Sequence, residues 1–426
     1  MRDETARGAA ARLVLGVTGD RVALSDQLAA GALTALAPPD RARAQRLALA
    51  TLRNLTRADR VLKPWLRKNP PPQVRAILRV AVTELFADGA AAHGVVSEAV
   101  SQTRASGRKA ESFAGMVNAV LRRVSEVPRE DWDRHPAEEL PGWLRGRLMS
   151  AYGKPATIAM EAAHARGAPV DLTPKDGDAV ALAERVGGQA LPTGSVRLSG
   201  PVQISDLPGF ETGDWWVQDA AAAMAARVLA PQPGERLLDL CAAPGGKTLQ
   251  LASSGAKVTA LDISEARLER LGENLARCRL TAETVTADAL EWAPEAPFDA
   301  ILLDAPCSAT GTIRRHPDLP HIRDAAGLKD LFALQSALLD RALGWLRPGG
   351  RLVFATCSLL PDEGERQVSA ALDRYAGLII NRAALDLPGV EPHWIKGETG
   401  LRLRPDFWPE YGGMDGFFIA RIDRVA

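Results

Sequence analysis

The sequence has few cysteines, no excess of either charge and no long apolar run. Its 426 residues include four cysteines, and no two of them have the C-x-x-C spacing typical of metal or redox sites. They are too few and too dispersed for a disulfide framework, so we expect reduced thiols and a cytoplasmic protein. No stretch approaches 18 uninterrupted apolar residues, which argues against a membrane span. Acidic residues close to the start argue against a cleaved secretory signal.

The absence of net charge conceals an asymmetry between the two parts of the chain. Residues 1–150 hold 24 basic and 16 acidic side chains, whereas residues 151–426 hold 28 basic and 36 acidic ones. Only nine of the 52 basic residues are lysine. Arginine can grip phosphate with two hydrogen bonds, although a GC-rich genome would produce the same bias. A basic first part joined to an acidic remainder suggests a division of labour.

Periodicity divides the chain into three predicted domains. Apolar residues recur at three- and four-residue spacing over residues 5–125, which predicts an all-α domain of about five to seven helices over 1–127. Residues 128–215 change to Pro, Trp and mixed charge and then to short β-like runs, which indicates a linker and a small α+β module. From 216 to 426 apolar strands alternate with helices, which predicts a Rossmann-like α/β domain with ligands at the carboxyl ends of its strands.

The segment 234–252, GERLLDLCAAPGGKTLQLA, is a strand, a small-residue turn and a helix. Cys241 stands where a P-loop needs its first glycine, and a G-x-G-x-x-G fingerprint is absent, so a site for S-adenosylmethionine remains. Asp262 ends the next strand, 23 residues after Asp239, and could accept both ribose hydroxyls; Asp288 could hold the adenine amine. Taken one at a time, Asp262 and Asp288 are equally well explained as turn residues or helix caps. The predicted cofactor residues are Cys241, Ala242, Ala243, Pro244, Gly245, Gly246, Lys247, Asp262, Asp288 and Asp304.

Two cysteines directly follow predicted strands. Cys307 lies in FDAILLDAPCSATGT, three residues after Asp304, and Cys357 lies in RLVFATCSLLPDEGE. A lone cysteine is more often a small buried apolar residue, but two at the ligand-binding edge favour nucleophilic chemistry. Carbon 5 of cytosine needs such help: a thiolate on carbon 6 makes the ring an enamine that can attack a methyl sulfonium. The residues alone do not rank Cys307 against Cys357, and Cys278 is given no role.

The motifs DLCAAPGGKT, LLDAPCSATGT and ATCSLLPDEGE resemble those of RNA 5-methylcytosine methyltransferases. The segments HGVVSEAV and FAGMVNAVLRR are similar to the NusB-like RNA-binding domain. The combined layout, over nearly the whole chain, resembles the bacterial 16S ribosomal RNA cytosine-5 methyltransferase family (RsmB/Sun/Fmu-like). The resemblance implies an S-adenosylmethionine-dependent monomeric enzyme that acts on ribosomal RNA without a metal.

The resemblance also implies individual catalytic roles. Cys357 would be the nucleophile, Cys307 would assist release of the product enzyme, and Asp304 would bind the cytosine edge. Ala309 stands where the family usually has glycine, which we expect to stiffen that loop. The family often has tryptophan near the position of His321, so this chain offers an imidazole there instead of an indole on which a base could stack.

Candidate phosphate contacts are Arg53, Arg57, Arg60, Arg122, Arg123, Arg314 and Arg315. For any one of them a solvated helix face is the more common explanation. Three alternatives stay open from the sequence. The same chemistry could act on transfer RNA or on large-subunit RNA. The chain could also be a non-catalytic RNA-binding, antitermination-like factor, against which the intact cysteines argue. A methyltransferase for a small molecule or protein would need neither the paired cysteines nor the basic domain.

Overall fold

The computed structural model describes residues 4–200 and 202–425. Within it the chain forms two units, each with its own core. The helical unit contains the residues up to Gly167 together with Ile313–Asp324, and the α/β unit contains Ala168–Thr312 and Ala325 onward. No helix in the described part of the chain is long and apolar enough to span a membrane.

The helical unit follows the predicted periodicity. Helix α1 begins after Thr5, whose hydroxyl accepts the Gly8 N–H at 3.2 Å, and α5 begins with proline, which lacks the N–H that would go unpaired there. The helices are α1 (Ala6–Thr18), α2 (Leu24–Ala29), α3 (Pro38–Arg53), α4 (Leu55–Leu62), α5 (Pro72–Phe86), α6 (Ala92–Ala105), α7 (Arg108–Glu111), α8 (Ala114–Val124), α9 (Arg129–Asp133), α10 (Gly142–Tyr152), α11 (Lys154–Arg166) and α16 (Leu319–Ile322). Two of the first eight, α2 and α7, are short, which explains the lower predicted number.

The segment predicted as a linker belongs to the helical unit. Glu138 accepts the Thr56 N–H and hydroxyl, both at 2.7 Å, which ties the proline-rich stretch to α4. On α11, the buried Glu161 accepts the Leu140 N–H at 2.9 Å and the Arg145 guanidinium at 2.8 Å. The first compact unit therefore extends to Gly167 rather than ending near 127.

The α/β unit begins with a small four-stranded antiparallel sheet in the order β2–β3–β1–β4. Its elements are β1 (Asp171–Pro174), α12 (Ala179–Val186), β2 (Gln189–Ala190), β3 (Val196–Arg197) and β4 (Trp215–Val217). Arg197 is buried, donates two hydrogen bonds of 2.7 Å to Asp171, and also donates to the carbonyls of Tyr411 and Gly413. This paired charge anchors the small sheet to the rest of the unit.

The large sheet has the order β11–β12–β13–β9–β8–β5–β6–β7, with β10 paired to β13. Its remaining elements are α13 (Ala220–Leu229), β5 (Arg236–Leu240), α14 (Gly246–Ser253), β6 (Lys257–Asp262), α15 (Glu265–Cys278), β7 (Glu283–Thr286), β8 (Phe298–Asp304), α17 (Leu328–Trp345), β9 (Leu346–Thr356), α18 (Glu365–Arg374), β10 (Leu378–Ile380), β11 (Ile395–Lys396), β12 (Gly400–Leu403) and β13 (Phe417–Arg424). Strands β5 to β9 are parallel, and β13 runs antiparallel to β9.

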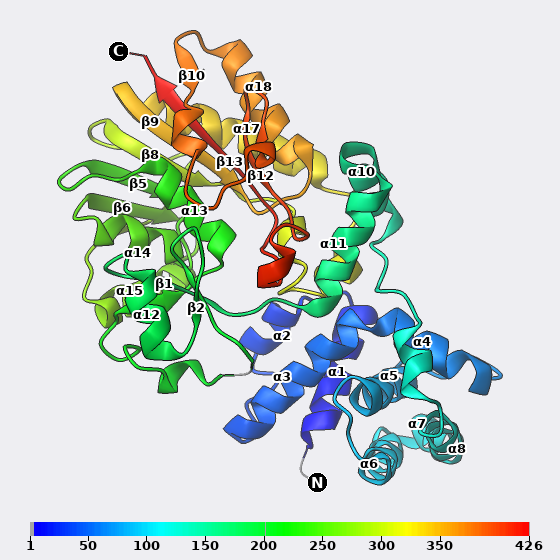
Figure 1. Ribbon diagram of the computed structural model, residues 1–426. Coiled ribbons are helices and arrows are strands. Elements are labelled where there is room, and N and C mark those ends of the chain that lie inside the picture. The colour runs from blue at the N-terminus through cyan, green and yellow to red at the C-terminus, as the bar shows by residue number, and fades with distance from the viewer. Residues whose placement is uncertain (1–3, 201, 426) are drawn as a thin grey trace. The chain divides into compact units, whose positions relative to one another are not determined.

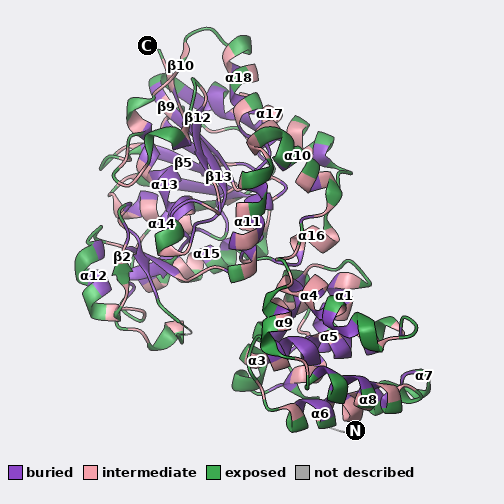
Figure 2. Ribbon diagram, turned by 45° about the vertical axis from the view of Figure 1, so that its right-hand side comes forward, coloured by how far each residue is buried: buried purple, intermediate pink, exposed green. Residues whose placement is uncertain are grey.

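Helices cover both faces of this sheet, which confirms the predicted α/β class. Helix α13 packs with Leu237, Ala300 and Val353 on one face, whereas α17 and α18 pack with Leu238 and Ile301 on the other (Figure 1). Because side chains alternate along a strand, both faces of the central strands are apolar and buried (Figure 2).

Candidate active site

The carboxyl ends of β5, β6, β8 and β9 lie along one edge of the sheet. Cys241 follows β5, Asp262 ends β6, Asp304 ends β8 and Cys357 follows β9. The chain runs outward from β5 through β6 to β7 and then returns to β8 on the other side of β5. The strand order therefore reverses between β5 and β8, and sheets of this kind bind ligands at such a point.

The loop after β5 depends on small residues. Cys241 has φ +63° and Gly245 has φ +106°, and α14 begins at Gly246. A Cβ on Gly245 would lie 2.2 Å from Cδ1 of Leu271, so only glycine fits without displacing α15. The first N–H groups of α14 therefore face the sheet edge from a closely packed turn.

Asp262 is buried behind this loop. Its carboxylate accepts the Ala243 N–H at 3.1 Å and the Ser264 N–H at 3.0 Å, and it lies 3.7 Å from the guanidinium of Arg267. Asp288, two residues after β7, is exposed and accepts the Leu290 N–H at 2.8 Å. Two carboxylates thus follow neighbouring strands on the same side of the glycine loop.

Lys247 connects the cofactor loop to the end of β8. Its Nζ lies 2.7 Å from Oδ2 of Asp304 and 5.4 Å from the centre of the Phe417 ring. Burial lowers the pKa of Lys247, but the charge and hydrogen bond of Asp304, with further contributions from Asp239 and Cys357, leave that pKa raised. Lys247 is therefore a stable cation at the centre of the site.

Asp239 lies in β5 beneath the loop and is fully buried. Its Oδ2 accepts the Thr248 hydroxyl at 2.6 Å. Burial raises the pKa of Asp239 from 3.8 to about 7, against the lowering effects of Thr248 and Lys247. Such a shift at a sheet edge marks a functional region on physical grounds.

The two predicted catalytic cysteines lie side by side. Sγ of Cys307 is 3.4 Å from Sγ of Cys357, and both residues are partly exposed. The hydrogen bond to Cys357, burial and the nearby charge of Glu363 raise the pKa of Cys307 well above its usual value. Cys307 therefore favours the protonated form, and either sulfur can be the donor in the contact between them.

A buried carboxylate joins the two cysteine loops. Glu363 is fully buried, and its Oε1 accepts the Ser308 N–H at 2.8 Å and the Gln335 amide at 3.0 Å. Its Oε2 accepts the hydroxyls of both Ser308 and Ser358, the residues that follow the two cysteines. Glu363 is not among the predicted site residues, although the repeated Cys-Ser pair beside an acidic turn is a signal in the sequence that points to it.

The predicted RNA contacts fall into three groups. Arg60, Arg122 and Arg123 are exposed on the helical unit, as a phosphate contact requires. Arg53 and Arg57 are partly buried and donate to backbone carbonyls within the unit, including Arg314 O at 3.0 Å and His135 O at 3.1 Å.

Arg314 is fully buried within the helical unit, so it cannot present its guanidinium at the surface, and Arg315 is partly buried. The prediction that Arg314 contacts phosphate is therefore wrong. The reason is that Ile313–Asp324 leaves the α/β unit and packs among the helices, where Asp318 accepts the Leu24 N–H at 2.9 Å. Within the described residues there is no group of three or more His, Cys, Asp or Glu that could hold a metal ion.

Comparison with known proteins agrees with both units. Residues 226–423 match the family described as 16S rRNA methyltransferase RsmB/F, and residues 4–126 match the NusB family. The "Ribosomal RNA small subunit methyltransferase B" of Serratia proteamaculans is 36% identical, with 91% of each chain covered. The protein of the same name from Xanthomonas campestris is 38% identical, covering 87% of this chain and 88% of its own. The crystal structure of PH0851 has a TM-score of 0.73 at 23% identity, covering 98% of this chain and 99% of its own.

The fold and the glycine loop at the switch point define an S-adenosylmethionine-dependent methyltransferase with a NusB-like helical domain. More narrowly, the chain belongs to the 16S rRNA methyltransferase RsmB/F family. The predicted family, fold class, enzyme class and cofactor are thereby confirmed.

Proposed function

We propose that this enzyme methylates carbon 5 of a cytosine in small-subunit ribosomal RNA through a covalent cysteine–cytosine adduct. The observation that carries the proposal is the 3.4 Å separation of the Cys307 and Cys357 sulfurs at the sheet edge beside the glycine loop. Methylation of an exocyclic nitrogen or an oxygen needs no thiol. Two thiols in contact fit a reaction that forms and then breaks a carbon–sulfur bond.

The residues at the edge fit S-adenosylmethionine by their chemistry. Bound there, the cofactor supplies a methyl group on a positively charged sulfur. Asp262 accepts one hydrogen bond at each carboxylate oxygen and keeps a further lone pair on each for the ribose hydroxyls. The exposed Asp288 would accept from the adenine amine, and the first N–H groups of α14 with Lys247 would hold the carboxylate of the methionine part.

Two features favour Cys357 as the nucleophile. Lys247 interacts electrostatically with Cys357, and a nearby cation stabilises a thiolate. Cys357 also directly follows β9, the strand beside β8, and lies two residues beyond Ala355, the β9 partner of Asp304.

The proposed reaction has three steps: addition of the thiolate, transfer of the methyl group and elimination of the thiolate. The Cys357 thiolate adds to carbon 6 of the cytosine, and the ring's displaced electron pair makes carbon 5 nucleophilic. Carbon 5 would then take the methyl group of the bound cofactor: the new carbon–carbon bond forms as the methyl–sulfur bond breaks, and the electron pair of that bond goes to the sulfonium sulfur, which leaves as a neutral thioether. A base removes the proton from carbon 5, and the returning electron pair breaks the carbon–sulfur bond and regenerates the thiolate. Asp304 would hold the edge of the base, and Cys307 would assist this last step.

The choice of small-subunit RNA is supported by the names of the relatives and by the NusB-like helical unit. The target base has to leave its stack to reach a sulfur at the sheet edge, as in other enzymes that act on bases. Transfer RNA and large-subunit RNA are the competing substrates for the same chemistry.

The proposal is tested with Cys357→Ala, Cys307→Ala and the control Cys278→Ala, all in the full chain. Cys278 is buried in a core cluster away from the sheet edge, so its loss leaves the chemistry intact. With tritiated S-adenosylmethionine and small-subunit RNA, we expect Cys357→Ala to transfer no methyl group. We expect Cys307→Ala to accumulate protein–RNA adduct on a denaturing gel.

Bisulfite sequencing of the product RNA identifies the methylated base. Turnover by Cys357→Ala would remove the nucleophile assignment. Turnover by the wild type without an adduct in Cys307→Ala would remove the release role. Methylation of transfer RNA or large-subunit RNA in preference to small-subunit RNA would change the substrate and leave the chemistry in place.

A further inference from the structure

A polar groove of about 570 Å³ runs between α6 and α8 of the helical unit. Its floor includes the apolar Val96 and Val100, and its polar side chains include a hydroxyl, an amide, an imidazole and two guanidiniums, from Ser97, Asn118, His93, Arg104 and Arg122. None of the described residues that line this groove carries a carboxylate. The groove therefore offers hydrogen-bond donors and positive charge without a competing internal anion.

The two arginines of the groove differ from several others in the helical unit. Arg104 and Arg122 are exposed, and in the part of the chain that the structure describes neither forms an ion pair. By contrast, Arg7 lies against Glu84 and Glu98, Arg46 is 2.7 Å from Asp88, and Arg75 and Arg79 share Asp59. The cations at the groove keep their charge for an external anion.

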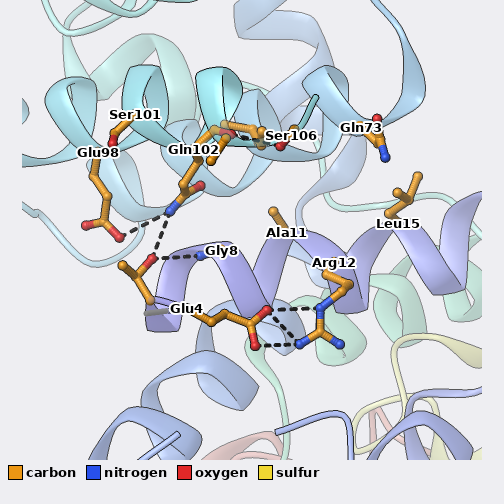
Figure 3. Close-up of a pocket in the computed structure, with 13 residues that line it drawn as sticks. Glu4, Gly8, Ala11, Arg12, Leu15, Gln73, Glu98, Ser101, Gln102 and Ser106 are labelled. Carbon is orange, nitrogen blue, oxygen red and sulfur yellow. Dashed lines mark hydrogen bonds and ion pairs between the residues drawn. The ribbon is translucent and has the colours of Figure 1, made fainter. Parts of the chain in front are cut away.

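The opposite side of α6 provides an internal comparison. A pocket of about 330 Å³ there is lined by Glu4, Glu98 and Arg12, and Arg12 lies 2.7 Å from Glu4 (Figure 3). Gln102 of the same helix hydrogen-bonds to Glu98 at 3.1 Å. The charged side chains of this pocket pair with one another, whereas the two arginines of the groove across the helix do not pair with a carboxylate in the groove.

Further cations flank the groove. Helix α7 packs against α6 and carries the exposed Arg108 and Lys109, and α8 carries the exposed Arg123. Arginine forks and hydroxyl groups are the side chains that contact RNA and DNA backbones most often.

We propose that the α6–α8 groove binds the sugar–phosphate backbone of the RNA substrate. The inference rests on the function proposed above and adds the surface that holds the RNA. Guanidiniums at either side neutralise phosphates, while the Ser97 hydroxyl and Asn118 hydrogen-bond to phosphate or ribose oxygens. Such contacts supply affinity and position the RNA without reading its bases. The groove explains which of the many arginines in this basic domain meet the RNA.

The test compares the double variant Arg104→Gln/Arg122→Gln with Arg12→Gln in the full chain. Arg12 lies on the other side of α6 in its ion pair with Glu4, so Arg12→Gln controls for the loss of one positive charge outside the groove. Binding of fluorescein-labelled small-subunit RNA is followed by anisotropy from about 50 to 200 mM salt. We expect the double variant to bind at least tenfold more weakly at 50 mM, with the salt slope reduced by about 2, one for each lost phosphate contact.

A second variant, Ser97→Asp, keeps both arginines and places an anion in the groove, and it should also weaken RNA binding. Unchanged far-UV circular dichroism establishes that each variant is folded. RNA binding by the double variant and Ser97→Asp equal to that of Arg12→Gln would overturn the proposal and leave the groove to an acidic protein segment. Failure of the wild type to methylate any RNA would instead overturn the proposed function.

Discussion

Single residues set the chemistry at the sheet edge. The two sulfurs can lie 3.4 Å apart because each cysteine follows one of two neighbouring parallel strands, β8 and β9. Strand pairing alone does not decide the separation, since Cys307 is three residues beyond its strand and Cys357 only one. Glu363 completes the arrangement, because one carboxylate accepts hydrogen bonds from the residues after both cysteines.

Replacement of Glu363 by Gln should change the acidity of Cys307. The Glu363 charge is one of the causes that raise the pKa of Cys307, so its removal should shift alkylation of Cys307 by iodoacetamide to lower pH. The serine hydroxyls can turn to accept from the glutamine amide, so this variant should keep its fold and much of its methyl transfer. The measurement is the pH profile of Cys307 labelling, mapped by mass spectrometry.

Glu363→Ala serves as the contrasting variant. It leaves buried donors unpaired and releases both loops, so methyl transfer should fall by roughly 100-fold, as misplaced catalytic groups do. An unchanged labelling profile in Glu363→Gln, or wild-type turnover in Glu363→Ala, would refute this positioning role.

At the scale of the elements, the turns that follow the strands determine where the residues of the site lie. The turns after β5 and β8 each place a residue other than glycine in the left-handed backbone region, Cys241 at φ +63° and Ala309 at φ +55°. The loop from Cys307 is held to the next strand's end, since the Gly311 N–H donates to Cys357 O at 2.9 Å and the Leu359 N–H to the Thr310 hydroxyl at 2.9 Å. The hydrogen bonds hold Ala309 in a conformation that alanine disfavours.

Ala309→Gly should therefore stabilise the protein. Relief of the left-handed strain exceeds the extra freedom of glycine in the unfolded chain, for a net gain of roughly 0.5–1 kcal/mol in the free energy of unfolding. The measurement is urea unfolding of the full chain. Gly311→Ala is the opposing control: its Cβ would lie 1.9 Å from Gly416 O, so it should destabilise. A loss of stability in Ala309→Gly would show that the loop is not strained.

At the scale of the whole molecule, each unit carries a buried titratable group, and the two groups have opposite effects on the pH dependence of stability. In the helical unit, burial lowers the pKa of His164 from 6.5 to about 3, and the charge of Arg314 adds to this. In the α/β unit, burial raises the pKa of Asp239 from 3.8 to about 7. The unfolded chain binds a proton at His164 before the folded chain does, and it releases the proton of Asp239 first.

The stability of the two units should consequently depend on pH with opposite signs. As pH drops from 6.5 toward 3, the unfolded state gains the His164 proton and the helical unit loses stability. As pH rises from about 4 to about 7, the unfolded state loses the Asp239 proton and the α/β unit loses stability. For each group the free energy of unfolding changes by up to about 1.4 kcal/mol per pH unit. Urea unfolding between pH 4 and 8, with the transition of each unit followed separately, should show a flatter pH dependence of the helical unit in His164→Phe and of the α/β unit in Asp239→Asn. Slopes equal to those of the wild type in both variants would contradict the assignment.

Local pattern was sufficient for much of the fold and for part of the candidate site. Apolar periodicity predicts the helices of the first 125 residues, and alternation predicts the parallel strands of the second part. The carboxyl ends of parallel strands share an edge, so the gathering of Asp262, Asp304 and Cys357 follows from local sequence. Domain limits were harder, because the proline-rich stretch near 128 has no apolar pattern that shows Glu138 bound to α4.

The sequence by itself determined the class of each unit, the glycine loop and the two cysteines, since these depend on short-range pattern and on residue type. Only the tertiary structure decided which side chains are available. Burial removed Arg314 from the surface, carboxylates pair with many arginines while Arg104 and Arg122 keep their charge exposed, and long-range hydrogen bonds brought Glu363 between the cysteine loops. The absence of net charge in the composition had no bearing on these outcomes. Charge acts through local pairing and solvent exposure, and both arise only when distant segments pack together.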